Sequence, residues 1–237
     1  MQAMILAAGF GQRLRPLTDR IPKALVEVAG VTQLGRTIGA LEAAGAERIV
    51  VNTHHHADQV EAWIGQQTYS SEIVTSREEP VPLETGGGLL HARSLFDDGS
   101  PILVHNVDVI TSIDLAALLH SHNPDDVATL AVHERPASRF LLFDDLGLQG
   151  RLDVRNGRRE EMREARGPVG RLAFSGVHIA SGSVFDLIEE TGAFSIVDLY
   201  LRLAREGASV SSLDVTDAQW FEIGTPERLE AARAALE

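Results

Sequence analysis

The chain has 237 residues, enough for one α/β domain with a sizeable core. The apolar fraction of 44% is ordinary for a globular protein, and the absence of cysteine excludes disulfides, Cys-ligated zinc and a thiol nucleophile. A formal net charge of −13 disfavours nucleic acid and anionic membrane surfaces as partners, so any phosphate site must depend on local cations and a metal.

No apolar stretch reaches the ~18 residues that a membrane span requires. The first nine residues lack a basic region and have a short apolar run, so we interpret them as a core strand rather than a signal peptide. A cysteine-free chain fits a reducing compartment, and we expect a cytoplasmic protein.

Apolar runs and helical patterns alternate along the first part of the chain, which predicts a mainly parallel sheet with helices on both faces. The expected strands are Ala3–Ala8, Arg48–Asn52, Glu72–Ser76, Pro101–Val109 and Thr129–His133. The expected helices are Thr37–Ala44, His56–Ile64, Gly86–Leu95 and Leu115–His120.

The pattern changes after residue 135. An antiparallel hairpin is predicted from Phe140–Phe143 and Leu152–Val154, and the charged Arg158–Arg166 reads as a solvated loop or short helix. Strands are then expected at Phe174–Ile179 and Val210–Val215, and helices at Ser183–Glu190, Ile196–Glu206 and Pro226–Leu236. We therefore predict one Rossmann-like α/β domain with a mixed, mainly parallel sheet, in two parts that comprise residues 1–135 and 136–237.

One lysine stands out among the basic residues. The 21 basic residues are 20 arginines and Lys23. In a chain that otherwise uses arginine, a single lysine indicates a task that suits a compact, mobile charge, such as binding phosphate. Chance retention of one surface lysine is the alternative.

A glycine-bearing loop follows the first strand. The run from Leu6 to Thr18 is Leu-Ala-Ala-Gly-Phe-Gly-Gln-Arg-Leu-Arg-Pro-Leu-Thr, and Pro22-Lys23 follows closely. Without Cβ atoms, Gly9 and Gly11 allow phosphate oxygens to approach the backbone N–H groups, and Arg13 suits bidentate phosphate contact. The loop is neither a dinucleotide fingerprint, which needs glycine or alanine where Leu14 stands, nor a P-loop, which needs Gly-Lys-Ser/Thr.

These residues resemble the signature of the sugar-1-phosphate nucleotidyltransferases, whose members share Leu-Ala-Ala-Gly-x-Gly-x-Arg-Leu, Pro-Leu-Thr and Pro-Lys. The resemblance implies that Arg13 binds the departing pyrophosphate and that Lys23 holds phosphate at the reacting centre. It implies that residues 1–135 form a nucleotide-binding half and residues 136–237 a sugar-binding half. The nucleotide site would include Leu6, Ala8, Gly9, Gly11, Arg13 and Lys23.

A second glycine run, Glu84-Thr85-Gly86-Gly87-Gly88, opens a predicted helix. Helix N-termini hold anions or present N–H groups to a base, and the family places nucleobase and sugar contacts here. We therefore add Glu84, Thr85, Gly86 and Gly87 to the nucleotide site. This form of the run most resembles the N-acetylmuramate 1-phosphate uridylyltransferase branch, and mannose-1-phosphate guanylyltransferases share most of the motifs.

Two carboxylates are candidates for magnesium. Asp108 follows a buried strand, where α/β folds present ligands, and matches the metal-binding aspartate of the family, although Val107 replaces the usual glycine. Glu222 lies in Trp-Phe-Glu-Ile-Gly-Thr-Pro, where the family has aspartate as its second metal ligand. Because Mg²⁺ is strict about geometry, the longer glutamate either binds directly, binds through water or fails to bind.

Candidate sugar contacts are Asn106, Gly176 and Asp198. Asn106 lies shortly before Asp108, and Gly176 resembles a family glycine whose backbone faces the sugar. Asp198 is equally well interpreted as a solvated helix residue. The Val-Glu-Lys-Pro sugar-phosphate element of many relatives is missing.

The resemblance implies Mg²⁺-dependent transfer of a nucleotidyl group from UTP or, as second choice, GTP to a sugar 1-phosphate, with release of pyrophosphate. The departures at Val107 and Glu222 leave a non-catalytic nucleotide-sugar-binding regulator as an alternative. A glycosyltransferase is the third hypothesis, and the pyrophosphate-handling motifs argue against it. The oligomeric state stays open, a homo-oligomer included.

Overall fold

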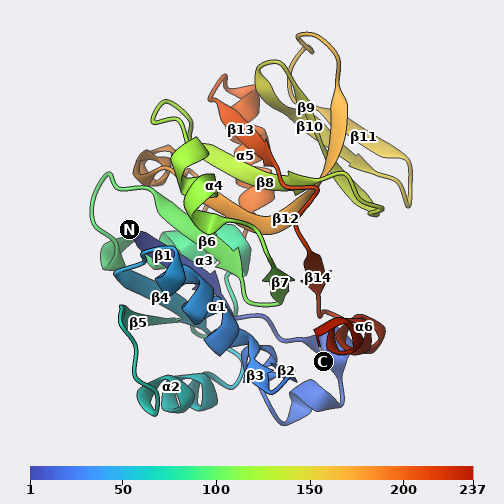
Figure 1. Ribbon diagram of the computed structural model, residues 1–237. Coiled ribbons are helices and arrows are strands. Elements are labelled where there is room, and N and C mark those ends of the chain that lie inside the picture. The colour runs from blue at the N-terminus through green and yellow to red at the C-terminus, as the bar shows by residue number, and fades with distance from the viewer. Residues whose placement is uncertain (237) are drawn as a thin grey trace.

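The computed structural model describes residues 1–236 and has one large sheet at its centre (Figure 1). Its strands follow the order β11-β10-β9-β12-β6-β1-β4-β5, and β8 lies between β12 and β13 on a branch. Their bounds are β1 Gln2–Leu6, β4 Arg48–Thr53, β5 Glu72–Arg77, β6 Ile102–Asn106, β8 Ala128–His133, β9 Arg139–Asp144, β10 Gly147–Asp153, β11 Arg158–Glu161, β12 Gly170–Ala180 and β13 Val210–Asp214.

The sheet is mixed. Strands β1, β4, β5 and β6 pair in parallel, as do β8 and β13, whereas β12 runs antiparallel to β6, β8 and β9. The hairpin strands β9, β10 and β11 are also antiparallel. The predicted α/β fold with a mixed sheet is therefore confirmed, but the expectation of a mainly parallel sheet is wrong, because β12 and the hairpin strands add antiparallel pairings. The long strand β12 joins residues from both predicted halves into one sheet.

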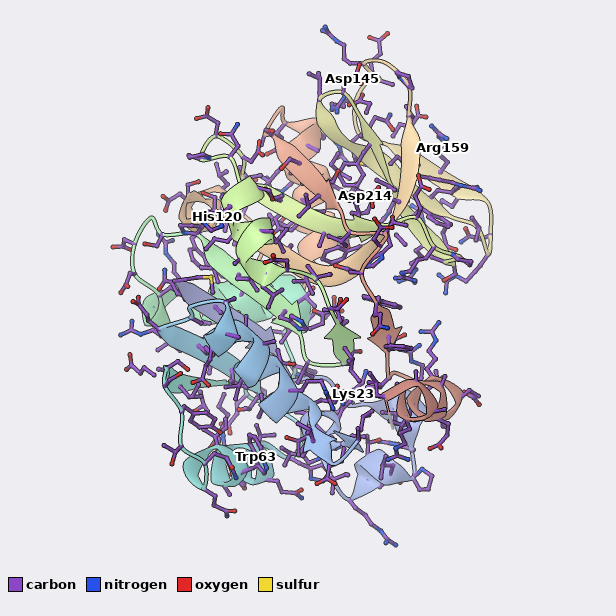
Figure 2. All side chains as sticks on the ribbon, in the orientation of Figure 1. Lys23, Trp63, His120, Asp145, Arg159 and Asp214 are labelled. Atoms are coloured by element: carbon purple, nitrogen blue, oxygen red, sulfur yellow. The ribbon has the colours of Figure 1, made fainter. Side chains whose placement is uncertain are left out.

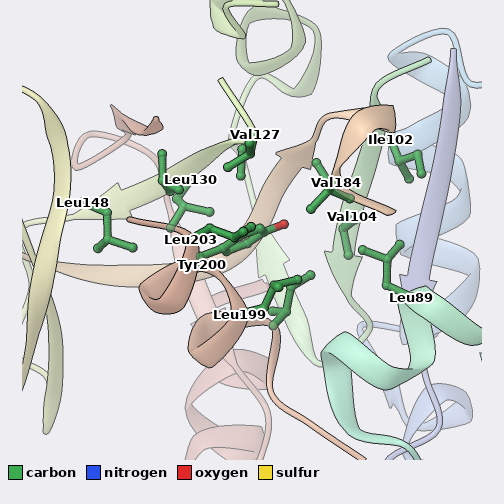
Figure 3. Packing of buried hydrophobic residues seen from close by; sticks show 14 of the residues in the cluster. Leu89, Ile102, Val104, Val127, Leu130, Leu148, Val184, Leu199, Tyr200 and Leu203 are labelled. Carbon is green, nitrogen blue, oxygen red and sulfur yellow. The ribbon is translucent and has the colours of Figure 1, made fainter. Parts of the chain in front are cut away.

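Helices cover both faces of the sheet because side chains of each strand point alternately to either side. On one face, Met4 and Val104 pack with residues of helices α3 (Glu84–His91) and α5 (Ile196–Arg205). Figure 3 shows Leu89 of α3 and Leu199, Tyr200 and Leu203 of α5 in this cluster.

On the other face, Ala3 and Ile5 pack against α1 (Gln33–Ala43), α2 (Ala57–Gly65) and α4 (Leu115–Ser121). None of the helices within residues 1–236 is long and apolar enough to cross a bilayer.

The closing helix α6 (Pro226–Leu236) packs on the N-terminal segment. Leu229 and Ala232 share a small core with Leu14, Val26 and Ile223. Thr225 caps the helix, since its Oγ1 accepts from the N–H of Arg228 at 3.4 Å. Residues from the two ends of the chain thereby form one structural unit beside the glycine loop (Figure 1).

The predicted strand Pro101–Val109 is wrong in its length, because the chain leaves the sheet after Asn106. The N–H of Val107 donates to the carbonyl of Leu6, and the chain resumes as β7 (Val109–Thr111), which pairs with β14 (Trp220–Glu222). The turn between β6 and β7 thus carries Asp108 out of the sheet.

The prediction of a loop or short helix at Arg158–Arg166 is wrong for its first part, which forms edge strand β11. Its charged side chains remain at the surface in ion pairs such as Arg159–Glu161. The charged composition therefore predicts the exposure of this segment correctly but not its backbone conformation. The neighbouring hairpin turn is tighter than predicted, with only Asp145 and Leu146 between β9 and β10.

The predicted helix Ser183–Glu190 is a 3-10 helix over Gly182–Leu187. Arg202 stops its continuation, because its guanidinium binds the carbonyl of Leu187 at 2.8 Å and the carboxylate of Glu190 at 2.7 Å. The glycine-run helix also differs, since α3 starts at Glu84 and a 3-10 turn at Arg93–Leu95 follows it. Two short strands that pattern reasoning missed, β2 (Glu27–Val28) and β3 (Val31–Thr32), connect the loop to α1.

Candidate active site

A cavity of about 480 Å³ lies where β1 and β6 end and α3 begins. We call it the first cavity. The predicted residues that line it are Leu6, Ala8, Gly9, Lys23, Glu84, Thr85, Asn106 and Asp108. The structure thus gathers at one place residues that are up to about one hundred positions apart in the chain.

The loop after β1 is fixed by a buried amide. The side-chain oxygen of Asn52 accepts from the backbone N–H groups of Ala7 and Ala8 at 2.5 and 3.2 Å. Gly11 has φ +63°, and a Cβ there would lie 2.8 Å from the methyl group of Thr18, so both its backbone and its surroundings require glycine. A Cβ on Gly9 would meet nothing within 4 Å, which shows that the cavity is open over this residue.

Lys23 and Asp108 form an ion pair in this cavity (Lys23 is labelled in Figure 2). Their side chains are 12% and 22% exposed, so the pair is largely removed from water and its two charges interact strongly. Lys23 opens a 3-10 turn after Pro22, and Ala24 on the same turn is fully buried, which fixes the backbone that carries the ammonium group.

Glu222 lies beside Asp108 through the pairing of β7 and β14. Glu222 is opposite Val109, and the N–H of Ile223 donates to the carbonyl of Asp108 at 3.0 Å. The carboxylate of Glu222 binds Arg13 at 3.1 Å and also pairs with Arg228.

Asp108 therefore lies in the turn before β7 and lines the first cavity, whereas Glu222 lies on the neighbouring strand β14 and does not line that cavity. Within residues 1–236 no group of three or more His, Cys, Asp or Glu side chains is arranged to hold a metal. Two carboxylates nevertheless suit Mg²⁺, which takes few protein ligands and completes its octahedral shell with phosphate oxygens and water. Arg13 itself is 64% exposed and is not among the residues that line the first cavity.

Pattern reasoning missed the buried group that holds these parts together. Glu78 is fully buried; one of its oxygens accepts from the Asn52 amide and the other from the N–H of Leu83, both at 2.7 Å. A Cβ on Gly88 would lie 2.6 Å from Glu78 Oε1. Glu78 thus connects the glycine loop, through Asn52, to the start of α3. The available signal was the polar Asn52 at the end of an otherwise apolar strand.

The glycine run divides into lining and packing residues. Glu84 (φ +59°) and Thr85 line the first cavity. Gly86 and Gly87 are buried instead, and their N–H groups donate to the carbonyl of Phe194 at 2.9 and 3.2 Å. The structure therefore places these two glycines in packing against the segment before α5, without free N–H groups for a ligand.

A second cavity, of about 720 Å³, adjoins the first, and Glu84 and Ser195 line both. We call it the second cavity. Its walls come from the hairpin strands β9 and β10, the start of α5 and β14. Asp198 lies here and pairs with Arg151, and Glu222 of β14 also lines this cavity.

Of the other sugar-site candidates, Asn106 lines the first cavity, and Gly176 lies behind it. Gly176 has φ +82°, and a Cβ there would approach the Asn106 amide nitrogen to 2.7 Å. The glycine thereby gives the Asn106 side chain its position.

Two buried histidines lie behind these cavities. Burial lowers the pKa of His105 to about 4, although the hydrogen bond to the Asn106 carbonyl and the charge of Asp108 both act to raise this pKa. Burial, with a smaller effect of His105, lowers the pKa of His178 to about 3. Neither ring nitrogen of His178 has a hydrogen-bond partner within residues 1–236, and its ring stacks edge-on against Tyr200. Both histidines are therefore neutral core residues at pH 7.

Comparison with known proteins identifies the family. The model of the family described as "Nucleotidyl transferase" matches residues 2–237. The chain is 35% identical to N-acetylmuramate alpha-1-phosphate uridylyltransferase of Caulobacter vibrioides, covering 99% of this chain and 96% of the relative. It is 36% identical to the same enzyme of Neisseria meningitidis serogroup B, covering 99% and 97%.

Among solved structures, the fold matches a putative glucose-1-phosphate thymidylyltransferase from Bacillus anthracis. The TM-score is 0.83 at 18% identity, and the match covers 100% of this chain and 95% of the other. This similarity concerns the fold, whereas the family model and the two uridylyltransferases also share the sequence. The chain therefore belongs to the nucleotidyl transferase family.

Proposed function

We propose that the protein transfers the uridylyl group of UTP to N-acetylmuramate 1-phosphate, giving a UDP-sugar and pyrophosphate. The reaction class, nucleotidyl transfer to a sugar 1-phosphate, follows from the family and from relatives that match over nearly the whole chain. The observation that carries the proposal is the pairing of Lys23 with Asp108 inside the first cavity, beside the glycine loop.

In the proposed reaction, an oxygen of the sugar 1-phosphate attacks the α-phosphorus of UTP. A new P–O bond forms, the bond to the β-phosphate oxygen breaks, and pyrophosphate leaves with the electron pair. The nucleophile is already an anion, so the protein's task is to align two anions and to neutralise the developing charge.

The residues divide this task by position. Lys23 neutralises charge at the α-phosphate, and the loop Leu6–Gly11 positions the nucleotide. Arg13, which is exposed and pairs with Glu222, receives the pyrophosphate. Glu84 and Thr85 lie at the nucleotide, and Asn106 at the sugar.

Asp108 and Glu222 would hold Mg²⁺. When bound, this ion would neutralise phosphate charge at the reacting centre. In the structure both carboxylates bind basic side chains, so we expect substrate and metal to displace these ion pairs.

UTP is favoured over GTP because both relatives with the higher sequence identity are uridylyltransferases. We further propose that the enzyme works in the cytoplasm, where nucleoside triphosphates are made and used. The oligomeric state does not enter the proposal, since the first cavity is lined from a single chain.

The test is pyrophosphate release over a grid of UTP, GTP, CTP and dTTP against several sugar 1-phosphates, with and without Mg²⁺. We expect the highest kcat/KM for UTP with N-acetylmuramate 1-phosphate, and none after chelation of the metal. Pyrophosphate release only with GTP and mannose 1-phosphate would show that the proposed substrates are wrong and that the enzyme is a guanylyltransferase. If the protein binds a nucleotide sugar but releases pyrophosphate with no substrate pair of the grid, a regulatory protein is favoured instead.

A further inference from the structure

Arg135 differs from the other arginines of the second cavity. Arg139, Arg151, Arg158 and Arg228 also line it, and each forms an ion pair with an Asp or Glu side chain. Within residues 1–236, Arg135 has no carboxylate partner, although 34 acidic residues outnumber 21 basic ones in the chain. An acidic protein thus leaves one cavity-lining cation uncompensated.

Arg135 is held in place by uncharged groups. Its guanidinium carbon lies 3.7 Å from the centre of the Trp220 ring, and one amino group donates to the carbonyl of Phe174 at 3.1 Å. Trp220 is itself fixed, because its indole N–H donates to the carbonyl of Ser175 at 2.8 Å. The guanidinium therefore has a defined orientation before any ligand binds.

This arrangement costs free energy in the unliganded protein. Arg135 is half-buried, and its Nε–H is buried without a partner within the described chain. Burial lowers the pKa of Arg135, and the nearby charge of Arg228 lowers it further. A partly desolvated guanidinium without an anion is unfavourable, whereas a planar oxyanion would satisfy its remaining donors in a bidentate contact.

We infer that Arg135 is an anion-binding residue of the second cavity and that its ligand is an oxyanion carried by the sugar 1-phosphate. The inference rests on the proposed function for the identity of the ligand. Two oxyanions of that substrate have the required chemistry, namely the 1-phosphate and the carboxylate of the lactyl ether. No lysine other than Lys23 exists in the chain to bind either of them.

Direct binding separates the two sources. Calorimetric titrations would use N-acetylglucosamine 1-phosphate, which has the phosphate but no carboxylate, and free N-acetylmuramate, which has the carboxylate but no phosphate. Loss of a charged hydrogen-bond pair predicts that Arg135→Gln weakens one of these probes roughly 10- to 100-fold. Weakening of only the first assigns Arg135 to the phosphate, and weakening of only the second assigns it to the carboxylate.

Steady-state kinetics provide the second measurement. With UTP and N-acetylmuramate 1-phosphate, Arg135→Gln should raise KM for the sugar substrate by roughly 10- to 100-fold, while KM for UTP stays within about threefold. Arg135→Lys keeps the charge but not the planar fork, and should lie between wild type and Arg135→Gln. Retained UTP binding in both variants shows that they fold.

Arg171→Gln is the matched control. Arg171 also stacks on an aromatic ring, with 5.4 Å between its guanidinium carbon and the Phe140 ring centre, but it lies outside the second cavity. This variant should leave both KM values unchanged.

The inference is overturned if Arg135→Gln binds both probes as wild type does, or if wild type binds neither. If the wild-type protein turns over and Arg135→Gln has an unchanged KM for the sugar substrate, the proposed function holds but Arg135 is not an anion-binding residue. Absence of wild-type turnover would contradict the proposed function, and calorimetry would still decide the role of Arg135.

Discussion

The two cavities are built in different ways. The first is formed by strand ends and a tight loop, and buried hydrogen bonds from Asn52 and Glu78 hold its backbone. The second is lined by arginine and carboxylate side chains, five of them on the antiparallel strands β9, β10 and β11. A rigid frame suits chemistry that needs fixed charges, whereas a wall of paired surface side chains suits selection among sugars. The difference predicts which kinetic constant each substitution changes.

The largest effect is expected from Asp108→Asn, which keeps the shape of the side chain but removes a charge from the first cavity. We expect kcat to fall roughly 100- to 1000-fold and the Mg²⁺ concentration for half-maximal rate to rise, as for loss of one preorganised electrostatic group. A titration of rate against Mg²⁺ measures both. Asp114→Asn, at the N-cap of α4, is a control outside either cavity. A normal Mg²⁺ dependence in Asp108→Asn would exclude Asp108 as a ligand.

A smaller effect is expected from Glu78→Gln. The glutamine amide can accept only one of the two hydrogen bonds that Glu78 accepts, so a buried N–H group loses its partner at a cost of about 1–3 kcal/mol in unfolding free energy. Because the first cavity depends on this frame, we expect KM for UTP to rise about tenfold with little change for the sugar substrate.

Urea unfolding and steady-state kinetics check this prediction, and Glu47→Gln, an 88% exposed side chain, is the control. Lower stability with an unchanged KM for UTP would give Glu78 a purely structural role.

The smallest effect concerns the core behind both cavities. Burial depresses the pKa of His105 and His178, so the unfolded chain takes up their protons first as the pH falls below about 6.5. Stability contributed by the neutral rings is complete above pH 6.5 and is lost as the pH falls towards 4. Between pH 7.5 and pH 5 the free energy of unfolding of His178→Leu should therefore fall by about 2 kcal/mol less than that of the wild type.

Denaturant unfolding at the two pH values measures this change. His120→Leu, which alters an exposed histidine, should leave the pH dependence as it is in wild type. If the unfolding free energy of His178→Leu depends on pH as strongly as that of the wild type, His178 is not buried in its neutral form.

The sequence predicts the first cavity well because its determinants are local. The loop from Leu6 to Lys23 occupies one short stretch, so its glycines, basic residues and family resemblance could all be read together as a phosphate site. Asp108 could be placed beside it because parallel strands present their carboxyl ends at one edge. The alternation of strands and helices likewise predicted the sheet and its two covered faces.

The second cavity could not be predicted in this way. Arg135 meets Trp220 beside β12, where Arg135 donates to the carbonyl of Phe174 and Trp220 donates to that of Ser175. The three segments that meet here are far apart in sequence. Edge strand β11 has the composition of a solvated loop, because both of its sides are charged. Glu78 was overlooked because the composition around it gives no sign that this carboxylate would be fully buried. Long-range pairing and burial, rather than local propensity, determine these features.

The most direct test of the account is single-turnover chemistry in Lys23→Ala with UTP, Mg²⁺ and N-acetylmuramate 1-phosphate. If the ammonium group meets the triphosphate in the first cavity, the chemical step slows by about 100-fold or more while UTP still binds. A rate within a factor of about two of wild type would show that the only lysine in the chain takes no part in the reaction.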